Sequence, residues 1–182
     1  MKKIIFLIFT IISFAGGQTA MSNDKLENTL YLDLKDGRVV IEMEPKFAPK
    51  HTARIKELVR QGFYDGIVFH RVIDGFMAQT GDPTGTGMGG SGKNLDAEFN
   101  ELPHTRGAVS MARAQDPNSA DSQFFIVFDN ATFLDKQYTV WGYVVEGMEF
   151  VDKIKKGDSG NNGSVDNPDK IIKMSVASDV EK

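Results

Sequence analysis

Hydrophobic and polar residues alternate along the chain from residue 29, in the stretch TLYLDLKDGRVVIEM. Every second position is hydrophobic in two successive runs, first Leu30, Leu32 and Leu34 and then Val39, Ile41 and Met43. Asp36-Gly37 lies between the runs, and an Asp-Gly pair favours the tight turn of a hairpin. Because a half-buried strand has a hydrophobic period of two, residues 29–43 predict a β-hairpin.

The hydrophobic period becomes helical after residue 48. Pro49 suits a first helical turn, and Gly62 is typical of a helix end. The hydrophobic stripe between them consists of Ile55, Leu58 and Val59. Hydrophobic residues at a spacing of three recur between Gly147 and Gly157. These patterns predict one helix between residues 49 and 62 and a second from about residue 147 to 156.

Short hydrophobic runs separated by loops rich in glycine, asparagine and aspartate predict further strands. They lie near residues 67–74, 76–80, 107–112, 123–128, 139–145 and 170–178. Many short strands with only two helices favour an antiparallel sheet, because each parallel pair would need a crossover connection. No linker or repeat divides residues 28–176, so we expect one mainly β domain, a closed barrel with a helix over each open end.

Composition narrows the possible functions. The 182 residues, 41% of them hydrophobic, are enough for one globular domain with a core. The net charge of −4 comes with dispersed basic residues, so nucleic acid is not an expected partner. The chain has no cysteine, which excludes disulfides, thiol nucleophiles and cysteine metal sites. Nothing in the sequence requires more than a monomer.

The N-terminus resembles a secretory signal. Lys2-Lys3 precede an 11-residue hydrophobic run, which is too short to span a bilayer. We expect a signal peptide over residues 1–20, cleaved after Ala15 or Ala20, and a soluble domain over residues 21–182 without stable membrane association, in the periplasm or outside the cell. Met21 offers an alternative start, which would give a cytoplasmic product.

Two glycine-rich stretches resemble ligand-binding loops. Residues 85–94, GTGMGGSGKN, approach two nucleotide-binding motifs, but no helical pattern follows them, so we expect a flexible surface loop. Residues 158–169 approach a calcium loop. Gly160 stands where a ligand is needed and Asp169 where glutamate is expected, so a solvated turn-rich loop is the better interpretation.

The three histidines, His51, His70 and His104, are far apart in the sequence, and no G-x-S-x-G motif accompanies them. A catalytic histidine would need a serine and an acid nearby in space. We expect all three to be structural.

Arg71 is unusual because it lies within the hydrophobic stretch FHRVIDGFMAQTGD, residues 69–82. In a strand it shares a face with Phe69 and Ile73. One interpretation is a buried arginine paired with Asp74 or Glu98; the other is a functional group. A second strand, near residues 123–128, also mixes a glutamine with phenylalanines. Polar donors among large apolar side chains are typical of a small binding pocket.

These segments resemble the cyclophilin-type peptidyl-prolyl cis-trans isomerases. The matching stretches are FHRVIDGFMAQTGD, the GTG loop, SMARAQDPNSADSQFFI and FLDKQYTVWGYVVEGMEFVDKI, in the family's order, within residues 28–176. The resemblance implies a closed eight-stranded antiparallel β-barrel capped by two α-helices. It also implies proline-containing polypeptide substrates and no cofactor or metal, because rotation about a peptide bond breaks no covalent bond. A peptide-binding or chaperone module of the same fold with incidental turnover is the alternative.

The resemblance assigns roles to individual residues. Arg71 corresponds to the catalytic arginine. Substrate-binding positions correspond to Phe76, Met77, Gln79, Ala112, Arg113, Gln123, Phe125, Phe133, Leu134 and Tyr138. The family usually has asparagine at the position of Arg113. Its best-known eukaryotic members have tryptophan and histidine at the positions of Phe133 and Tyr138, so this chain is similar to bacterial members and should bind cyclosporin weakly.

Overall fold

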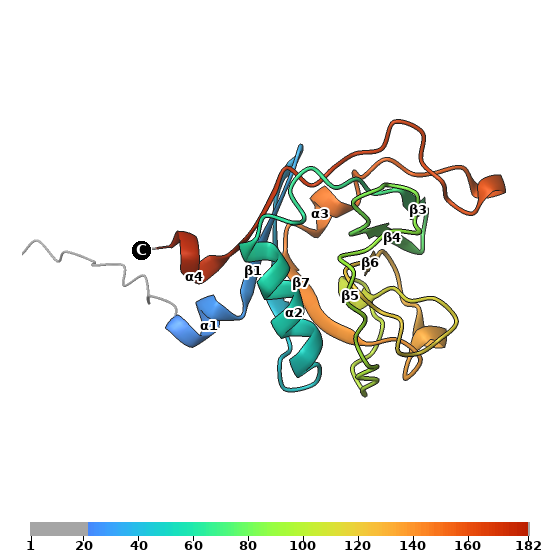
Figure 1. Ribbon diagram of the computed structural model, residues 1–182. Helices are drawn as coiled ribbons and strands as arrows, with labels where there is room; N and C mark the ends of the chain where they lie inside the picture. Colours follow the sequence, from blue (N-terminus) through green and yellow to red (C-terminus); the bar gives the residue numbers. More distant parts are fainter. Residues whose placement is uncertain (1–21, 182) are drawn as a thin grey trace, which may run out of the picture.

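The structure is a computed structural model that describes residues 22–181. The predicted signal, its candidate cleavage sites and the alternative start at Met21 lie outside these residues. One eight-stranded sheet organises the chain, in the order β3-β4-β6-β5-β7-β2-β1-β8 (Figure 1). All of its strand pairs are antiparallel. The mainly β, antiparallel, eight-stranded class predicted from the sequence is therefore confirmed.

The strands occupy most of the predicted positions, although several are shorter than expected. They are β1 (Thr29–Leu34), β2 (Gly37–Met43), β3 (Arg71–Ile73), β4 (Met77–Thr80), β5 (Ala108–Met111), β6 (Phe124–Val127), β7 (Val140–Glu146) and β8 (Lys173–Val176). The expected β1–β2 hairpin is present, but Leu34 lies opposite Gly37, so its two turn residues are Lys35 and Asp36, one position before the expected Asp36-Gly37 turn. Gly37 has a φ of 153°.

The expected closure of the barrel is overstated. The sheet is strongly curled, but its edge strands β3 and β8 do not pair with each other within residues 22–181 (Figure 1). An irregular segment covers β3 instead: Arg71 bridges Ser164, and the amide of Val72 donates to the carbonyl of Gly163. β3 is only three residues long, so a loop rather than a strand completes this side.

Four helices and two 3-10 turns accompany the sheet. They are α1 (Asn23–Glu27), α2 (Pro49–Arg60), α3 (Met148–Val151), α4 (Ala177–Val180), η1 (Thr132–Leu134) and η2 (Ser159–Asn161). The two helices expected from the sequence are α2 and α3, but α3 is a single turn, whereas ten residues were expected. α1 and α4 are too short to show a hydrophobic period and were not predicted. None of the helices between residues 22 and 181 is both long and apolar enough to cross a bilayer.

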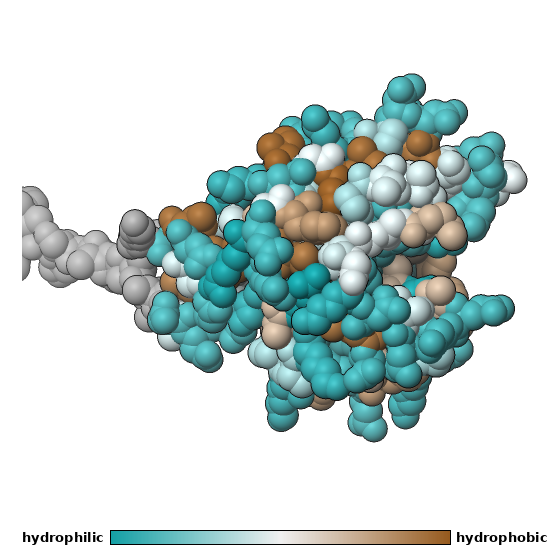
Figure 2. Space-filling model, viewed as in Figure 1, coloured by the Kyte–Doolittle hydropathy of each residue, from teal (hydrophilic) through white to brown (hydrophobic). Residues whose placement is uncertain are grey.

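Strand β6 separates two hydrophobic clusters. Phe124 and Ile126 pack into the main core inside the curled sheet, whereas Phe125 and Val127 belong to a second cluster on the opposite face. This alternation follows from the two-residue period of a strand. Figure 2 shows a largely polar surface with separate hydrophobic patches. The second cluster, outside the main core, is where the candidate site lies.

Candidate active site

A cavity of about 310 Å³ opens over the second hydrophobic cluster. Ten of the eleven residues to which the sequence assigns a role line it: Arg71, Phe76, Met77, Gln79, Ala112, Arg113, Phe125, Phe133, Leu134 and Tyr138. The eleventh, Gln123, lines an adjacent cavity of about 350 Å³, which shares Gln79, Ala112 and Arg113 with the first. We call these two spaces the first and the second cavity.

The floor of the first cavity is apolar and aromatic. Met77, Phe125 and Leu134 are buried. The ring of Tyr138 meets that of Phe125 edge to face, with centroids 5.9 Å apart. Phe76 also contacts an aromatic ring, that of Phe133, at 5.5 Å. Such a surface fits a compact hydrophobic group.

Strand register brings the polar groups to this floor. Arg71 on β3 lies opposite Gln79 on β4, and Gln79 lies opposite Phe125 on β6. Residues that oppose each other on neighbouring strands point to the same face. Three segments that are distant in the sequence thus place a guanidinium, an amide and an aromatic ring in one row.

The guanidinium of Arg71 is held by neutral oxygen atoms. Its Nη1 donates to Oε1 of Gln79 at 3.1 Å. Its Nε and Nη2 donate to the main-chain and side-chain oxygens of Asn162, both at 3.0 Å. Burial lowers the pKa of Arg71, but arginine remains protonated in proteins. The guanidinium therefore keeps its positive charge.

The alternative in which Arg71 pairs with an acid is not observed. Neither Asp74 nor Glu98 contacts its guanidinium. Glu98 instead accepts the main-chain N–H groups of Lys50 and His51, each at 3.0 Å, at the start of α2. The sequence pattern suggested this acid as a partner, but its position in a separate loop takes it to the helix N-terminus.

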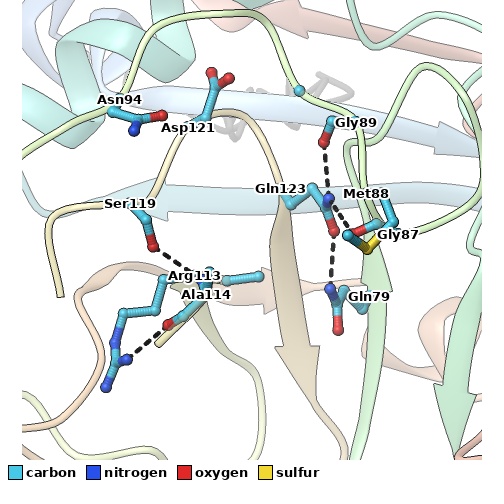
Figure 3. Close-up of a pocket in the computed structure, with 12 residues that line it drawn as sticks. Gln79, Gly87, Met88, Gly89, Asn94, Arg113, Ala114, Ser119, Asp121 and Gln123 are labelled. Carbon is cyan, nitrogen blue, oxygen red and sulfur yellow. Dashed lines mark hydrogen bonds between the residues drawn. The ribbon is translucent and has the colours of Figure 1, made fainter. Parts of the chain in front are cut away.

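Two glutamines connect Arg71 to the glycine-rich loop. Nε2 of Gln79 donates to Oε1 of Gln123 at 2.9 Å. Nε2 of Gln123 donates in turn to the carbonyl oxygens of Gly87 and Gly89 at 2.9 and 2.8 Å (Figure 3). Each amide is used as donor and acceptor, so its orientation is defined by its neighbours.

Sequence reasoning missed several residues that shape the site. Asn162 anchors Arg71 from a loop that follows it by 91 residues, and no sequence pattern connects the two. Asp82 is buried, and its carboxylate accepts the amides of Thr84, Thr86 and Gly87. The sequence did contain a signal for Asp82, because an acid directly before a glycine-rich loop can accept the main-chain amides of that loop. Asp82 organises the loop whose carbonyls receive Gln123.

The histidines lie behind the site or away from it. His104 stacks on Phe125 at a centroid distance of 6.2 Å, and its ring nitrogens contact Asp135 Oδ1 at 2.9 Å and Ser110 Oγ at 3.0 Å. Although this set resembles a Ser-His-Asp triad, His104 and Ser110 are fully buried and no substrate can reach them. Burial lowers the pKa of His51, His70 and His104 alike, which keeps all three neutral near pH 7.

The two motif-like loops lack the context that their ligands need. Residues 95–107 contain no helix, so the glycine-rich loop does not lead into the helix N-terminus of a nucleotide site. In the loop from Asp158, Asn162 is engaged with Arg71, and the Asp158 carboxylate accepts the amide of Gly160. No group of three or more histidine, aspartate or glutamate residues within 22–181 could hold a metal ion.

Fold and cavity together define a mainly β protein with an apolar cleft beside a fixed guanidinium. The family model described as "Cyclophilin type peptidyl-prolyl cis-trans isomerase/CLD" matches residues 29–176. A probable peptidyl-prolyl cis-trans isomerase of Brucella suis is 54% identical over 95% of this chain and 94% of its own length. Peptidyl-prolyl cis-trans isomerase B of Bacillus subtilis is 44% identical over 71% of this chain and 92% of its own.

Solved structures agree with this relationship. A cyclophilin from Hirschia baltica has a TM-score of 0.76 and 30% identity, covering 85% of this chain and 76% of its own. A Cryptosporidium parvum cyclophilin crystallised in the presence of the dipeptide Ala-Pro has a TM-score of 0.75 and 30% identity, covering 81% of this chain and 98% of its own. The chain belongs to the cyclophilin-type peptidyl-prolyl cis-trans isomerases, and it is an enzyme of that class.

Proposed function

We propose that Arg71 is the catalytic residue of this isomerase and that the first cavity holds the proline ring of an Xaa-Pro segment in a polypeptide. The observation that carries this proposal is the placement of an uncompensated guanidinium over an apolar floor, fixed by Gln79 and Asn162. Neither partner is an acid, so the charge remains available to a substrate.

The chemistry of the reaction explains why a guanidinium suits it. Rotation about an Xaa-Pro bond breaks amide resonance, at a barrier of about 18–20 kcal/mol. As the amide twists, the lone pair of the prolyl nitrogen becomes available to a hydrogen-bond donor. An arginine offers a rigid, permanently charged donor, and three of the five N–H groups of Arg71 already fix its orientation. Donation to the prolyl nitrogen stabilises the twisted state more than the planar one.

The magnitudes indicate that Arg71 does not act alone. An acceleration of about 10⁵-fold requires roughly 7 kcal/mol of differential binding. A hydrogen bond to a charged group contributes about 1.5–3 kcal/mol. We assign the rest of this free energy to two sources. The first is immobilisation of the substrate's proline ring by Phe76, Met77, Phe125 and Leu134. The second is contacts of the rotating carbonyl with Gln79 and backbone groups.

Replacement of Arg71 tests the proposal. We expect Arg71→Ala to lower kcat/KM for an Ala-Pro tetrapeptide roughly 10- to 150-fold, the equivalent of one charged hydrogen bond, while the fold persists. The rate is measured by NMR exchange spectroscopy and the fold by circular dichroism. Arg106→Ala is the matched control, because Arg106 pairs with Asp152 and lines neither cavity. Full turnover by a folded Arg71→Ala protein would make the arginine structural.

We also propose that the protein is exported and acts as a monomer on proline-containing chains in the periplasm or outside the cell. Lys2-Lys3 and the hydrophobic run after them support export. Cell fractionation with N-terminal sequencing should give a mature chain that begins after Ala15 or Ala20. A cytoplasmic chain beginning at Met21 would contradict export, and light scattering would report the oligomeric state.

A further inference from the structure

The two arginines that line the first cavity are distinguished by their partners. Residues 22–181 contain six arginines, and four of them form ion pairs: Arg38, Arg54, Arg60 and Arg106. Within the same residues, Arg71 and Arg113 form none. Acids are in excess in this chain, whose net charge is −4. Although the chain as a whole is negatively charged, the cleft contains two guanidinium groups that no acidic side chain of residues 22–181 neutralises.

Arg113 is held in place by neutral groups. Its Nε and Nη2 donate to the carbonyl oxygen of Gln137 at 3.2 and 3.1 Å. Its Nη1 donates to the carbonyls of Ala114 at 2.9 Å and Gln115 at 3.2 Å. Four of five N–H groups are used in this way, and the fifth, on Nη2, remains for another acceptor. The guanidinium is therefore fixed without being neutralised.

Aromatic rings complete the setting of Arg113. Its Cζ lies 4.6 Å from the ring centroid of Tyr138 and 5.8 Å from that of Phe99. A guanidinium over an aromatic face is attracted to it and loses little of its charge. Tyr138 also contacts Phe125 on the floor of the first cavity. Tyr138 thus connects Arg113 to the floor of the first cavity, where we propose that the proline ring binds.

The position of Arg113 between the two cavities places it beside the residues that flank a bound proline. Both cavities are lined by Arg113. Asp121 also lines the second cavity, but Figure 3 shows it near Asn94, at the opposite end from Arg113. Its carboxylate accepts the amides of Gly92 and Lys93 and contacts Ser91. Of the three residues that line both cavities, only Arg113 is charged.

We propose that Arg113 determines substrate preference by favouring an acidic side chain at one of the two positions that flank the proline. The inference rests on the proposed function, because the first cavity must hold the proline. A substrate carboxylate would accept the free N–H of Nη2 and meet an uncompensated charge. In a partly exposed cleft this preference is worth roughly a two- to five-fold change in kcat/KM, and salt weakens it.

The experiment compares peptides that differ in charge but little in shape. Two series, Ala-Xaa-Pro-Ala and Ala-Ala-Pro-Xaa, carry glutamate, glutamine or lysine at Xaa, and their kcat/KM values are measured by NMR exchange spectroscopy. In one series the wild-type enzyme should prefer glutamate to glutamine by roughly two- to five-fold and glutamine to lysine by a similar factor. Salt at about 0.5 M should bring both ratios towards one.

Variants assign the preference to the residue. Arg113→Gln should bring the glutamate-to-glutamine ratio to one, whereas Arg113→Lys, which keeps the charge, should retain most of it. Arg106→Gln is the matched control and should leave the ratio unchanged. A ratio of one in both series for the wild-type enzyme, or an unchanged ratio in a folded Arg113→Gln protein, would overturn the inference. Turnover of Ala-Ala-Pro-Ala that depends on Arg71 tests the proposed function separately.

Discussion

At the scale of residues, the orientation of Arg71 is fixed by the side-chain amides of Asn162, Gln79 and Gln123. Asn162 takes two N–H groups of Arg71 and Gln79 takes a third. Gln123 fixes Gln79 and is itself fixed by the carbonyls of Gly87 and Gly89. Amides suit these places because they donate and accept at once and carry no charge that would neutralise the arginine.

The pH dependence of turnover follows from the groups around the cleft. Arginine does not titrate in the working range, and burial lowers the pKa of His70 and His104 below their ordinary value of about 6.5. Both histidines are therefore neutral above that value and remain neutral somewhat below it. We expect kcat/KM to be nearly constant from about pH 5.5 to 8.5. A sigmoid centred near pH 6.5 would instead implicate a histidine with an ordinary pKa.

Phe133 should limit cyclosporin affinity. Its ring lies at the rim of the first cavity and is 65% exposed, so a larger ring fits there without disturbing the core. Phe133→Trp adds an indole N–H donor, and a neutral hydrogen bond contributes about 0.5–1.5 kcal/mol. Titration calorimetry should show cyclosporin binding roughly 2- to 12-fold more tightly than to wild type. Phe133→Tyr, which adds a hydroxyl but no indole N–H, is the comparison variant, and equal affinity of the Trp variant and wild type would contradict the expectation.

At the scale of elements, long periodic stretches were predictable, whereas the extents of short elements and the residues placed by long-range contacts were not. The two-residue period of residues 29–43 and the helical stripe of residues 49–62 predicted β1, β2 and α2, because the hydrophobic positions of each pattern are buried. α3 is shorter than its pattern: the helix ends at Val151, although Ile154, the next residue of the stripe, is also buried. Ten residues that line the first cavity were predicted from the resemblance to cyclophilins. Asn162 was not predicted, because its contact with Arg71 is long-range and no local sequence pattern encodes it.

Helix α2 depends on a loop for its N-terminus. Its N-cap residue, Ala48, has no side-chain acceptor, and Glu98 supplies the carboxylate that accepts the first amides. Burial alone would raise the pKa of Glu98, but hydrogen bonds from His51 and Lys50 lower it overall. Glu98→Gln should reduce the free energy of unfolding by about 1 kcal/mol, as for a lost cap. Urea denaturation beside Glu101→Gln, a change at an exposed acid, measures the difference, and equal stability would refute the capping role.

At the scale of the whole molecule, the two ends of the described chain, residues 22–181, are joined by elements outside the family match. α1 and α4 lie side by side beyond residues 29–176 (Figure 1). Arg60 of α2 donates to Glu27 at 2.8 Å and to Asp179 at 2.9 Å, and Ser178 also donates to Glu27. Because cleavage after Ala15 or Ala20 would leave α1 intact, this arrangement is compatible with the proposed mature chain.

The junction of the chain ends should stabilise the protein in a pH-dependent way. The hydrogen bond from Arg60 lowers the pKa of Glu27 to about 2, below the unfolded value of about 4.3. A carboxyl group with a lowered pKa stabilises the fold above its unfolded pKa, and this contribution disappears as the pH falls through the folded value. At neutral pH, Glu27→Gln should therefore lower Tm by roughly 2–4 °C, since a partly exposed pair contributes up to about 1 kcal/mol.

The same substitution should have little effect in acid. The contribution of the ionised carboxyl disappears as the pH approaches the folded pKa of about 2, so the Tm values of wild type and Glu27→Gln should converge there, provided that both proteins remain folded. Differential scanning calorimetry at pH 7, 4 and 2.5 follows the convergence, with Glu101→Gln as the control for the loss of one exposed acid. A Tm difference that stays constant from pH 7 to 2.5 would mean that Glu27 acts through packing and not through its ion pair with Arg60.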